Sequence, residues 1–571
     1  MTACGRQPAP DSRMSTMKRG MRNIAYWSAG PRARDAIVVL APFGLYVVHS
    51  LLLGNWIIDD AGISFAYSRN LAHGYGLVSQ PGLAPVEGFS NFSWVVLLAF
   101  FSKSGLFNPL TTPKLVAGSL VLLSYVIVGR IAVAVSGRPR KVTLLALTLL
   151  SINTSFVVWT MSGLENSLYA FLTLLLLERT ATYARRGNTA VVVGISLLAF
   201  LIAVTRPDGL LYALVFPVLA LLSAVPGHKP AKRAGADCLV YFSILAVLLA
   251  VFAVFRVHYF KDILPHTYYV KGGPGLGTLE DLVLMRPTIY EKSYGLLWSV
   301  GWGLAGPLTV CLIFTTMWLV NNRSLTESHA AVILVLGVAA LVYILLPRDW
   351  WPEFRFATPF FAPFYLWLLL LAERTKARLW PAIPLRAVPL RSALLIGTLL
   401  ALNVAFFAVR TRRFIAHKPV PFDIVAADFG TRFNAYASFL GMTSASILVP
   451  DVGGVLYYSN LRVYDLGGLT DKRIAQTLGR DSKSFYEYVF EDARPTFIAI
   501  HGSWTYAANL DADARFRTDY APIGEWEDSW ISQAYGLDMK SGDYVRREAI
   551  QNKPGAIDSL RKIYCPRPVS F

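Results

Sequence analysis

The chain has 571 residues, of which 54% are hydrophobic and only 16% are charged. Soluble globular domains carry charge on about a quarter of their residues, so this composition excludes an ordinary soluble enzyme. Apolar runs of about 20 residues recur along the chain and match the thickness of a hydrocarbon core, which predicts a polytopic α-helical membrane protein. The net charge of +18 does not indicate a nucleic-acid partner, because much of the excess Lys and Arg lies in short loops between apolar runs, as expected for loops beside membrane lipid.

The first 35 residues form a basic tail that we expect in the cytosol, and they lack an obvious cleavage site, so the first apolar segment is predicted to be retained. Apolar runs then alternate with basic loops and predict about 11 spans of a multi-pass cell (plasma or inner) membrane protein with a cytoplasmic N-terminus. The predicted spans are 36–58, 113–135, 142–160, 165–183, 189–205, 209–225, 238–258, 295–320, 329–346, 358–373 and 392–409. Residues 59–90 are the first outer loop, and 91–106 are predicted to be a short interfacial or re-entrant helix.

After residue 410 charged residues become common and no run is long enough to span. We predict a transmembrane region over 36–410 and an extracytoplasmic α/β domain over 411–571. The turn Asp451-Val452-Gly453-Gly454 lacks the three-glycine spacing of a dinucleotide-binding loop. Short strands are predicted at 446–449, 462–464 and 497–500, with a helix at 485–490.

Ionisable residues at the outer ends of the predicted spans form the candidate site. Asp59 and Asp60 directly follow the first span, where charge is costly unless it is solvated or paired, so these residues are functional candidates. Acidic and basic side chains that converge on one membrane face describe a site at the outer leaflet. The other candidates on this face are Glu87, Glu165, Arg206, Asp208, Lys261, His266, Arg348, Trp350 and Arg355.

Each candidate also has a purely structural interpretation. Asp59, Asp60 and Glu165 can be caps at the starts of helices, and Arg206 with Asp208, near a proline, can be a local ion pair. Arg348 and Arg355, beside tryptophans, can be interfacial anchors. His266, after a proline, can be a loop residue.

This combination of side chains suits transfer of a sugar from a lipid phosphate. The leaving phosphate needs cationic support, which Arg supplies through forked hydrogen bonds. The acceptor hydroxyl needs a base, and a carboxylate serves that role. A single displacement at the anomeric carbon therefore needs an Asp on one side of the sugar and cationic groups on the other.

Two segments of the first outer loop, 59–65 (DDAGISF) and 69–78 (RNLAHGYGLV), resemble membrane GT-C glycosyltransferases, and more narrowly the group containing the mycobacterial terminal β-(1→2) arabinofuranosyltransferase. Residues 86–94 (VEGFSNFSW) are similar to that group's Val-Glu-Gly-Tyr-(Thr/Ser)-Asn-Phe-Leu-Trp. Gly62 and Arg348 depart from the group, since many relatives have a bulky apolar residue and Gly at these positions. Shorter matches follow in order at 162–165, 206–209, the loop around Pro265, 355–356 and 463–471.

The resemblance implies an inverting glycosyltransferase that moves a sugar, with arabinofuranose as the leading candidate, from a polyprenyl-phosphate donor to a cell-envelope glycan or glycolipid. It places the catalytic carboxylate at Asp59 or Asp60, and we expect Asp59 to be the base. No cofactor is firmly implied, and a divalent cation at the Asp pair stays open. The donor phosphate is assigned to Arg206, Lys261, His266, Arg348 and Arg355, and the acceptor or sugar to Glu87, Glu165, Asp208 and Trp350.

Two other functions stay open. A transporter or flippase for a lipid-linked saccharide would often show internal repeats and polar residues near mid-membrane, and neither is evident in the sequence. A non-catalytic envelope scaffold would act through residues 411–571.

Overall fold

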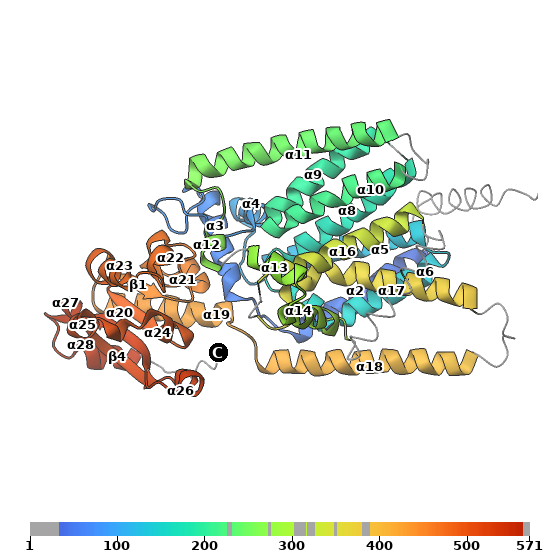
Figure 1. Cartoon of the computed structure of the whole chain (residues 1–571). Coiled ribbons are helices and arrows are strands. Elements are labelled where there is room, and N and C mark those ends of the chain that lie inside the picture. The colour runs from blue at the N-terminus through green and yellow to red at the C-terminus, as the bar shows by residue number, and fades with distance from the viewer. Residues whose placement is uncertain are drawn as a thin grey trace, which may run out of the picture.

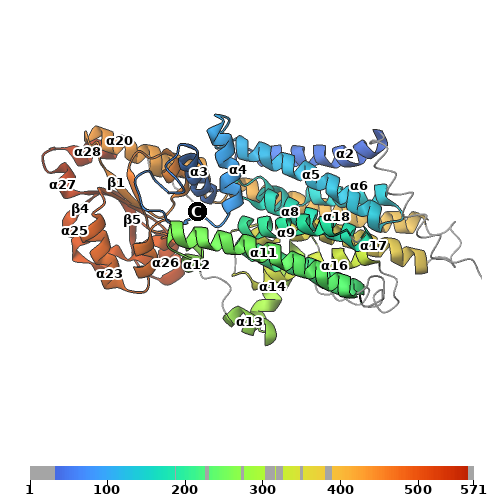
Figure 2. The same ribbon diagram turned by 90° about the horizontal axis from the view of Figure 1, so that it is seen from above.

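The computed structural model describes residues 33–186, 188–224, 231–271, 276–301, 316, 326–347, 351–379 and 389–563. Figure 1 shows a bundle of long helices with an α/β domain, formed by the C-terminal part of the chain, at one end of the bundle. The view from above in Figure 2 shows the same arrangement. The predicted fold class, a helical membrane protein with a C-terminal α/β domain, is confirmed.

The long helices of the bundle follow the apolar runs of the sequence. The last of them continues to Ala416, so the α/β domain begins later than residue 411. A 3₁₀ segment at Pro207–Leu214 precedes α10, and another at Arg355–Ala357 precedes α17. The helices are α2 (Ala33–Leu52), α5 (Thr112–Val135), α6 (Pro139–Ile152), α7 (Thr154–Thr160), α8 (Asn166–Arg186), α9 (Thr189–Thr205), α10 (Val215–Ala224), α11 (Ala231–Phe260), α12 (His266–Lys271), α13 (Leu276–Val283), α14 (Pro287–Trp298), α16 (Glu327–Leu345), α17 (Thr358–Leu379) and α18 (Pro389–Ala416).

Six helical segments among the described residues are long and apolar enough to cross a membrane, or seven if the bent pair α6–α7 is one span. The sequence predicts about 11. Part of the difference comes from α9, which has only 17 residues, and from the predicted span 295–320, most of which lies outside the described residues. The exact number of spans therefore stays a prediction.

One predicted span is broken. The sequence predicts a single helix over 142–160, but α6 and α7 meet at an angle of 72°. The break falls at Asn153, whose backbone is extended and whose side chain accepts a hydrogen bond from the Phe156 N–H. Its amide also donates to Tyr365 and to the carbonyl of Ser299. Asn favours such a cap over the interior of a helix, which explains the break.

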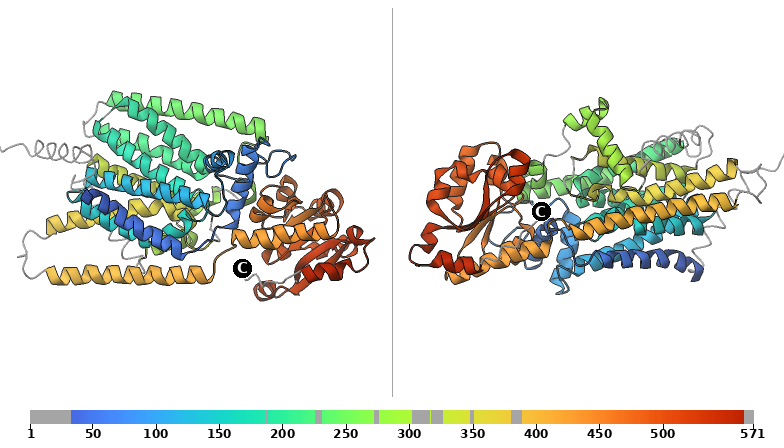
Figure 3. Two further views of the ribbon diagram at one scale, coloured as in Figure 1. Left: turned by 180° about the vertical axis from the view of Figure 1, so that it is seen from behind. Right: turned by 90° about the horizontal axis from the view of Figure 1, so that it is seen from below.

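The first outer loop is partly helical. It contains α3 (Asp59–Ala72), and α4 (Phe92–Lys103) follows it as the short helix expected within 91–106. Eleven of the residues of α3 are buried although α3 lies outside the long helices. Figure 3 shows the reason, because α3 lies between the bundle and the α/β domain.

The α/β domain contains a five-stranded sheet with the order β2-β1-β3-β5-β4. The strands β2, β1 and β3 are parallel to one another. β5 pairs antiparallel with β3, and β4 pairs antiparallel with β5. The first three strands confirm the predicted ones, whereas β4 and β5 were not predicted. The strands are β1 (Ser446–Val449), β2 (Arg462–Asp465), β3 (Phe497–Ile500), β4 (Tyr520–Glu527) and β5 (Lys540–Arg546).

Short helices cover the sheet. The predicted helix at 485–490 is α23 (Ser482–Glu487) followed by a π-helical turn at Tyr488–Ala493. The others are α19 (Phe422–Val425), α20 (Arg432–Phe439), α21 (Gly453–Tyr458), α22 (Lys472–Thr477), α24 (Ser503–Ala508), α25 (Ala514–Asp519), α26 (Ser529–Tyr535), α27 (Arg547–Ile550) and α28 (Ala556–Ile563), with a second π-helical turn at Ala426–Thr431.

The two faces of the sheet contribute to different hydrophobic cores. Leu448 packs in one core, and its neighbours Ile447 and Val449 pack in the other, as the alternation of side chains along a strand requires. The second core also contains Ile63 and Tyr67 of α3. The α/β domain and the first outer loop therefore share one buried apolar core.

Candidate active site

Arg355 lies between two carboxylates. Its Nη1 is 3.8 Å from Oδ2 of Asp60, and its Nη2 is 3.7 Å from Oε1 of Glu165. Its Nε has no hydrogen-bond partner among the described residues, although the side chain is only 11% exposed. Trp159 and Phe356 place their rings 5.7 Å from the guanidinium carbon. A nearly buried guanidinium whose Nε lacks a partner is suited to binding an additional anion.

Glu165 is the centre of the polar network behind Arg355. Its Oε1 accepts a hydrogen bond of 2.9 Å from Nη1 of Arg206, and its Oε2 accepts one of 2.8 Å from Nδ2 of Asn91. Burial alone would raise the pKa of Glu165, but the charges of Arg355 and Arg206 outweigh burial and lower that pKa. Glu165 is therefore ionised and holds both arginines.

Arg206 ends α9 at a proline-marked break. Its Nε donates to Oδ1 of Asp208 at 3.0 Å, so the local ion pair considered as a structural alternative is present. The Tyr169 hydroxyl donates to Oδ2 of the same carboxylate at 3.0 Å. Because Arg206 also binds Glu165, this local pair is continuous with the Arg355 network.

Asp59 faces a different part of the molecule from Asp60. Its Oδ2 accepts a hydrogen bond of 2.9 Å from the Gly453 N–H, and its Oδ1 accepts one of 2.7 Å from the Gly454 N–H. Burial, with the charge of Asp451, raises the pKa of Asp59 well above its ordinary value, while the two N–H donors act in the opposite direction. Asp59 is 4% exposed, and its carboxylate contacts the α/β domain. Asp60 is the member of the pair that faces Arg355.

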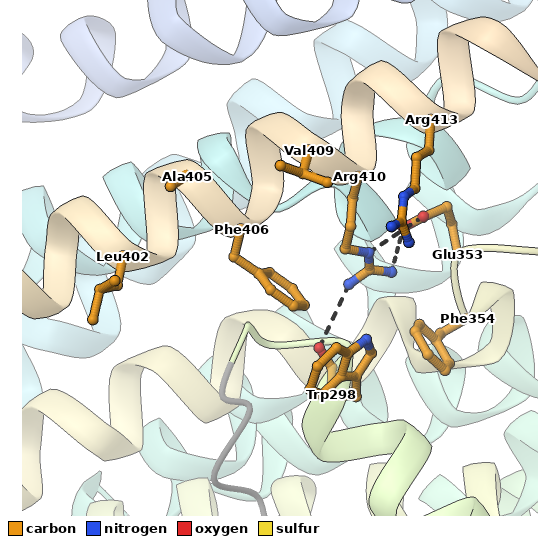
Figure 4. Close-up of a pocket in the computed structure, with 9 residues that line it drawn as sticks. All are labelled: Trp298, Glu353, Phe354, Leu402, Ala405, Phe406, Val409, Arg410 and Arg413. Atoms are coloured by element: carbon orange, nitrogen blue, oxygen red, sulfur yellow. Dashed lines mark hydrogen bonds and ion pairs between the residues drawn. The ribbon is translucent and has the colours of Figure 1, made fainter.

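A groove ends close to this network. Its volume is about 640 Å³, and Figure 4 shows the side chains that line it. Along α18 the lining is apolar at first and then cationic at Arg410 and Arg413. Arg410 forms a buried ion pair with Glu353, which lies next to Phe354 in a left-handed turn that leads directly to Arg355. The lining residues are Trp298, Glu353, Phe354, Leu402, Ala405, Phe406, Val409, Arg410 and Arg413.

A second polar cluster lies around Glu87. Its Oε2 accepts a hydrogen bond of 2.8 Å from Nε of Arg256, and its carbonyl accepts one from the His266 N–H. Burial raises the pKa of Glu87 to about 7 although Arg256 opposes this shift. Burial and the charge of Lys472 lower the pKa of His266, so its ring is neutral at neutral pH. Lys261 is exposed and donates to the carbonyl of His258.

The structure thus brings together Asp60, Glu165, Arg206, Asp208 and Arg355. The hydrogen bonds described for Asp59, Glu87, Lys261 and His266 go to other partners. The predicted residues Arg348 and Trp350 lie outside the described residues.

Several partners were not predicted. Arg256 lies within a predicted apolar span, and an arginine inside a span could have suggested a buried carboxylate partner. Asn91 is part of the motif at 86–94 but was given no role. Gly453 and Gly454 were recognised only as a turn, and no sequence pattern connects them to Asp59.

The side chains around Asp59 and Asp60 decide whether the pair could hold a metal ion. Among the described residues, no group of three or more His, Cys, Asp or Glu lies close enough to hold a metal ion. Both oxygens of Asp59 accept backbone hydrogen bonds, and Arg355 lies beside Asp60. The pair therefore does not form a ready cation site.

Comparisons with known proteins identify the fold. One family, described as a domain of unknown function (DUF8728), matches residues 428–545. No curated protein matches the chain in sequence. Several solved structures of the oligosaccharyltransferase AglB from Archaeoglobus fulgidus match in fold.

The complex of that enzyme with an inhibitory peptide and a dolichol-phosphate has a TM-score of 0.51 at 12% identity, over 80% of this chain and 69% of that one. The form tethered to an acceptor peptide has a TM-score of 0.55 at 12% identity, over 86% and 73%. The complex with Zn and sulfate has a TM-score of 0.51 at 12% identity, over 80% and 67%. At this identity the likeness establishes the fold alone: the chain has a fold similar to that of these structures.

Proposed function

We propose that this protein is a membrane glycosyltransferase that transfers a sugar from a polyprenyl-phosphate donor to a cell-envelope glycan or glycolipid. The observation that carries this proposal is the nearly buried Arg355 guanidinium, which lies beside Asp60 and Glu165 and whose Nε has no hydrogen-bond partner among the described residues. The fold neighbour has been solved with a dolichol-phosphate and with an acceptor peptide, which supports a lipid phosphate and an extended acceptor as ligand types.

The reaction follows from the side chains. The acceptor hydroxyl attacks the anomeric carbon while the bond from that carbon to the phosphate oxygen breaks. Asp60 accepts the proton of the hydroxyl on one face of the sugar. The polyprenyl phosphate leaves from the opposite face, and we assign its negative charge to Arg413 and to the Nε of Arg355, the nitrogen that contacts neither Asp60 nor Glu165. One displacement inverts the anomeric centre. Glu165 and Arg206 hold Arg355 in position for this step.

The groove along α18 supplies a place for the lipid chain. Its apolar wall suits an isoprenoid, and its cationic end at Arg410 and Arg413 suits the phosphate. Arg410 is already paired with Glu353, so Arg413 is the arginine of this groove that we assign to the phosphate region. Arabinofuranose stays the leading candidate for the sugar, on the resemblance of the first outer loop.

Orientation is part of the proposal. The N-terminus is cytoplasmic, and α3, the Arg355 network and the α/β domain lie on the outer face. Reporter fusions after residue 80 and at the C-terminus test this, because both must report an extracytoplasmic position.

The function is tested with Asp60→Asn and a matched control. Asp281→Asn is the control, because Asp281 is also a partly exposed Asp beside an arginine, with 26% exposure against 23% for Asp60, but lies on α13 away from the network. Membranes receive labelled polyprenyl-phosphate sugars. Asp60→Asn should lower kcat by about 10² to 10⁴, the range for loss of a general base, while Asp281→Asn keeps the wild-type rate. Unchanged transfer by Asp60→Asn would refute the assignment.

A further inference from the structure

We propose that Asp59 and Arg69 form a clamp that fixes α3 to the α/β domain, and that Asp59 is a positioning residue for Asp60. The part of this proposal that concerns Asp60 rests on the proposed function. The clamp assigns the α/β domain a task in the reaction, namely to hold the catalytic carboxylate in place from the outside.

The clamp holds the short helix α21 at both of its ends. The two carboxylate oxygens of Asp59 accept the Gly453 and Gly454 N–H groups at the amino end. At the other end the guanidinium of Arg69 donates to the carbonyls of Leu456 and Tyr457. Acceptor oxygens at the amino end and a cationic donor at the carboxyl end satisfy the N–H and C=O groups that the ends of a helix leave without intrahelical partners.

The backbone packing at this contact tolerates only glycine. A Cβ on Gly453 would lie 1.8 Å from the carbonyl oxygen of Asp59, and a Cβ on Gly62 would lie 2.4 Å from the backbone of Gly453. Real Cβ atoms do not approach other atoms so closely, so both glycines are needed for α3 and α21 to meet. This contact gives a physical reason for Gly62, one of the two positions at which the chain departs from the group that its first outer loop resembles.

Further contacts support the same docking. The Asp59 N–H donates to the carbonyl of Val420 at 3.0 Å, and the Phe422 N–H donates to the carbonyl of Ile57 at 2.9 Å. The side-chain amide of Gln80 binds the backbone at β2, the edge strand of the sheet: its Nε2 donates to the carbonyl of Leu461, and its Oε1 accepts from the Val463 N–H. The first outer loop and the residue before Ile58 therefore contact the region after α18 at several points between Ile57 and Gln80.

The effect on chemistry comes from adjacency. Asp60 is the next residue after Asp59 at the start of α3, so any shift of the helix start moves the Asp60 carboxylate relative to Arg355. The two carboxylates point to different neighbours because successive residues of a helix do not face the same side. Displacement of a reacting group by about 1 Å typically costs about 10²-fold in rate.

The test uses the full-length protein in detergent and four variants. Asp59→Asn removes one acceptor from the clamp, Arg69→Gln removes its far end, and Gly453→Ala introduces the clash from the α/β domain. Gly430→Ala is the control, because its added Cβ meets only ordinary contacts of 3.6 to 3.7 Å in the same domain. Hydrogen exchange of the peptide at 450–458 and the pH profile of kcat are measured for each.

Asp59→Asn and Gly453→Ala should both accelerate exchange at 450–458 and lower kcat by about 10²-fold, with the shape of the pH profile unchanged. Arg69→Gln should accelerate the same exchange, and Gly430→Ala should match the wild type. Loss of activity in Asp59→Asn without faster exchange, or wild-type kcat in Gly453→Ala, would overturn the clamp. Full activity in Asp60→Asn would instead refute the proposed function, while the exchange results would still report on the docking.

Discussion

Glu165→Gln is the most direct test of the network behind Arg355. Glu165 is 1% exposed, and its Oε1 is 2.9 Å from Arg206 and 3.7 Å from Arg355. The substitution keeps the size of the side chain and removes its charge, so two nearly buried guanidiniums lose their shared counter-charge.

The magnitude follows from burial. Two unit charges about 4 Å apart interact by about 4 kcal/mol at an effective dielectric constant of 20, and by only about 1 kcal/mol in water. Removing one member of a buried ion pair costs about 3 to 5 kcal/mol, because the remaining charge stays buried without compensation. Arg206 keeps Asp208 and Arg355 keeps Asp60, so we expect Glu165→Gln to destabilise the protein by an amount at the lower end of this range, about 3 kcal/mol.

Glu280→Gln is the control for this prediction. Glu280 is 2.6 Å from Arg286, a shorter separation than that of the Glu165 pair, but its side chain is 56% exposed. Exposed pairs contribute at most about 1 kcal/mol, so this variant should unfold close to the wild-type temperature. Thermal unfolding of both variants is measured in the same detergent and at the same scan rate.

The pH dependence gives a second measurement. Because the arginines lower the pKa of Glu165, its contribution is present above the ordinary Glu pKa and is lost as the pH falls through the lowered value. The difference in stability between wild type and Glu165→Gln should therefore stay constant from pH 8 to about pH 5 and shrink in stronger acid. Equal destabilisation by Glu165→Gln and Glu280→Gln would refute the reasoning from burial.

Further substitutions test the other buried charges. The pKa of Glu87 is raised to about 7, so Glu87 favours the folded state most below its ordinary pKa of 4.5, and this contribution is lost as the pH rises to about 7. Glu87→Gln should flatten that part of a profile of melting temperature against pH, and parallel profiles for the two proteins would contradict the raised pKa. Arg410→Ala leaves Glu353 buried without its cation and should lower the free energy of unfolding by about 3 to 5 kcal/mol. Arg410→Met combined with Glu353→Gln should recover most of the melting temperature. No recovery would mean that packing, and not charge, is lost.

The sequence predicts elements well where one local pattern decides them. The apolar runs at 446–449 and 497–500 predict β1 and β3 at their observed bounds. β5 was not predicted because Ser541, Gly542 and Asp543 interrupt its apolar pattern, although all three are buried in the structure. The break at Asn153 was missed because, besides the local bond from Phe156, its amide has partners in two distant parts of the chain, Ser299 and Tyr365.

The candidate site was predictable as a set of residues more than as a set of contacts. The membrane-edge position of Asp60, Glu165, Arg206 and Arg355 identified them, and the structure brings them together. The choice between Asp59 and its neighbour was not predictable, since it depends on glycines 394 and 395 positions away. We expected Asp59 to be the base, and we now propose Asp60.

A double-mutant cycle separates a clamp from two independent contacts. If Asp59 and Gly453 act on the same docking, Asp59→Asn combined with Gly453→Ala should accelerate exchange at 450–458 and lower kcat little more than either substitution alone, because residues in direct contact are not additive. Asp60→Asn combined with Gly453→Ala is the comparison, because Asp60 takes no part in the clamp hydrogen bonds. This double variant should show the same exchange at 450–458 as Gly453→Ala alone. Fully additive losses of kcat in the first pair would mean that Asp59 acts on the reaction by a route other than the α/β domain.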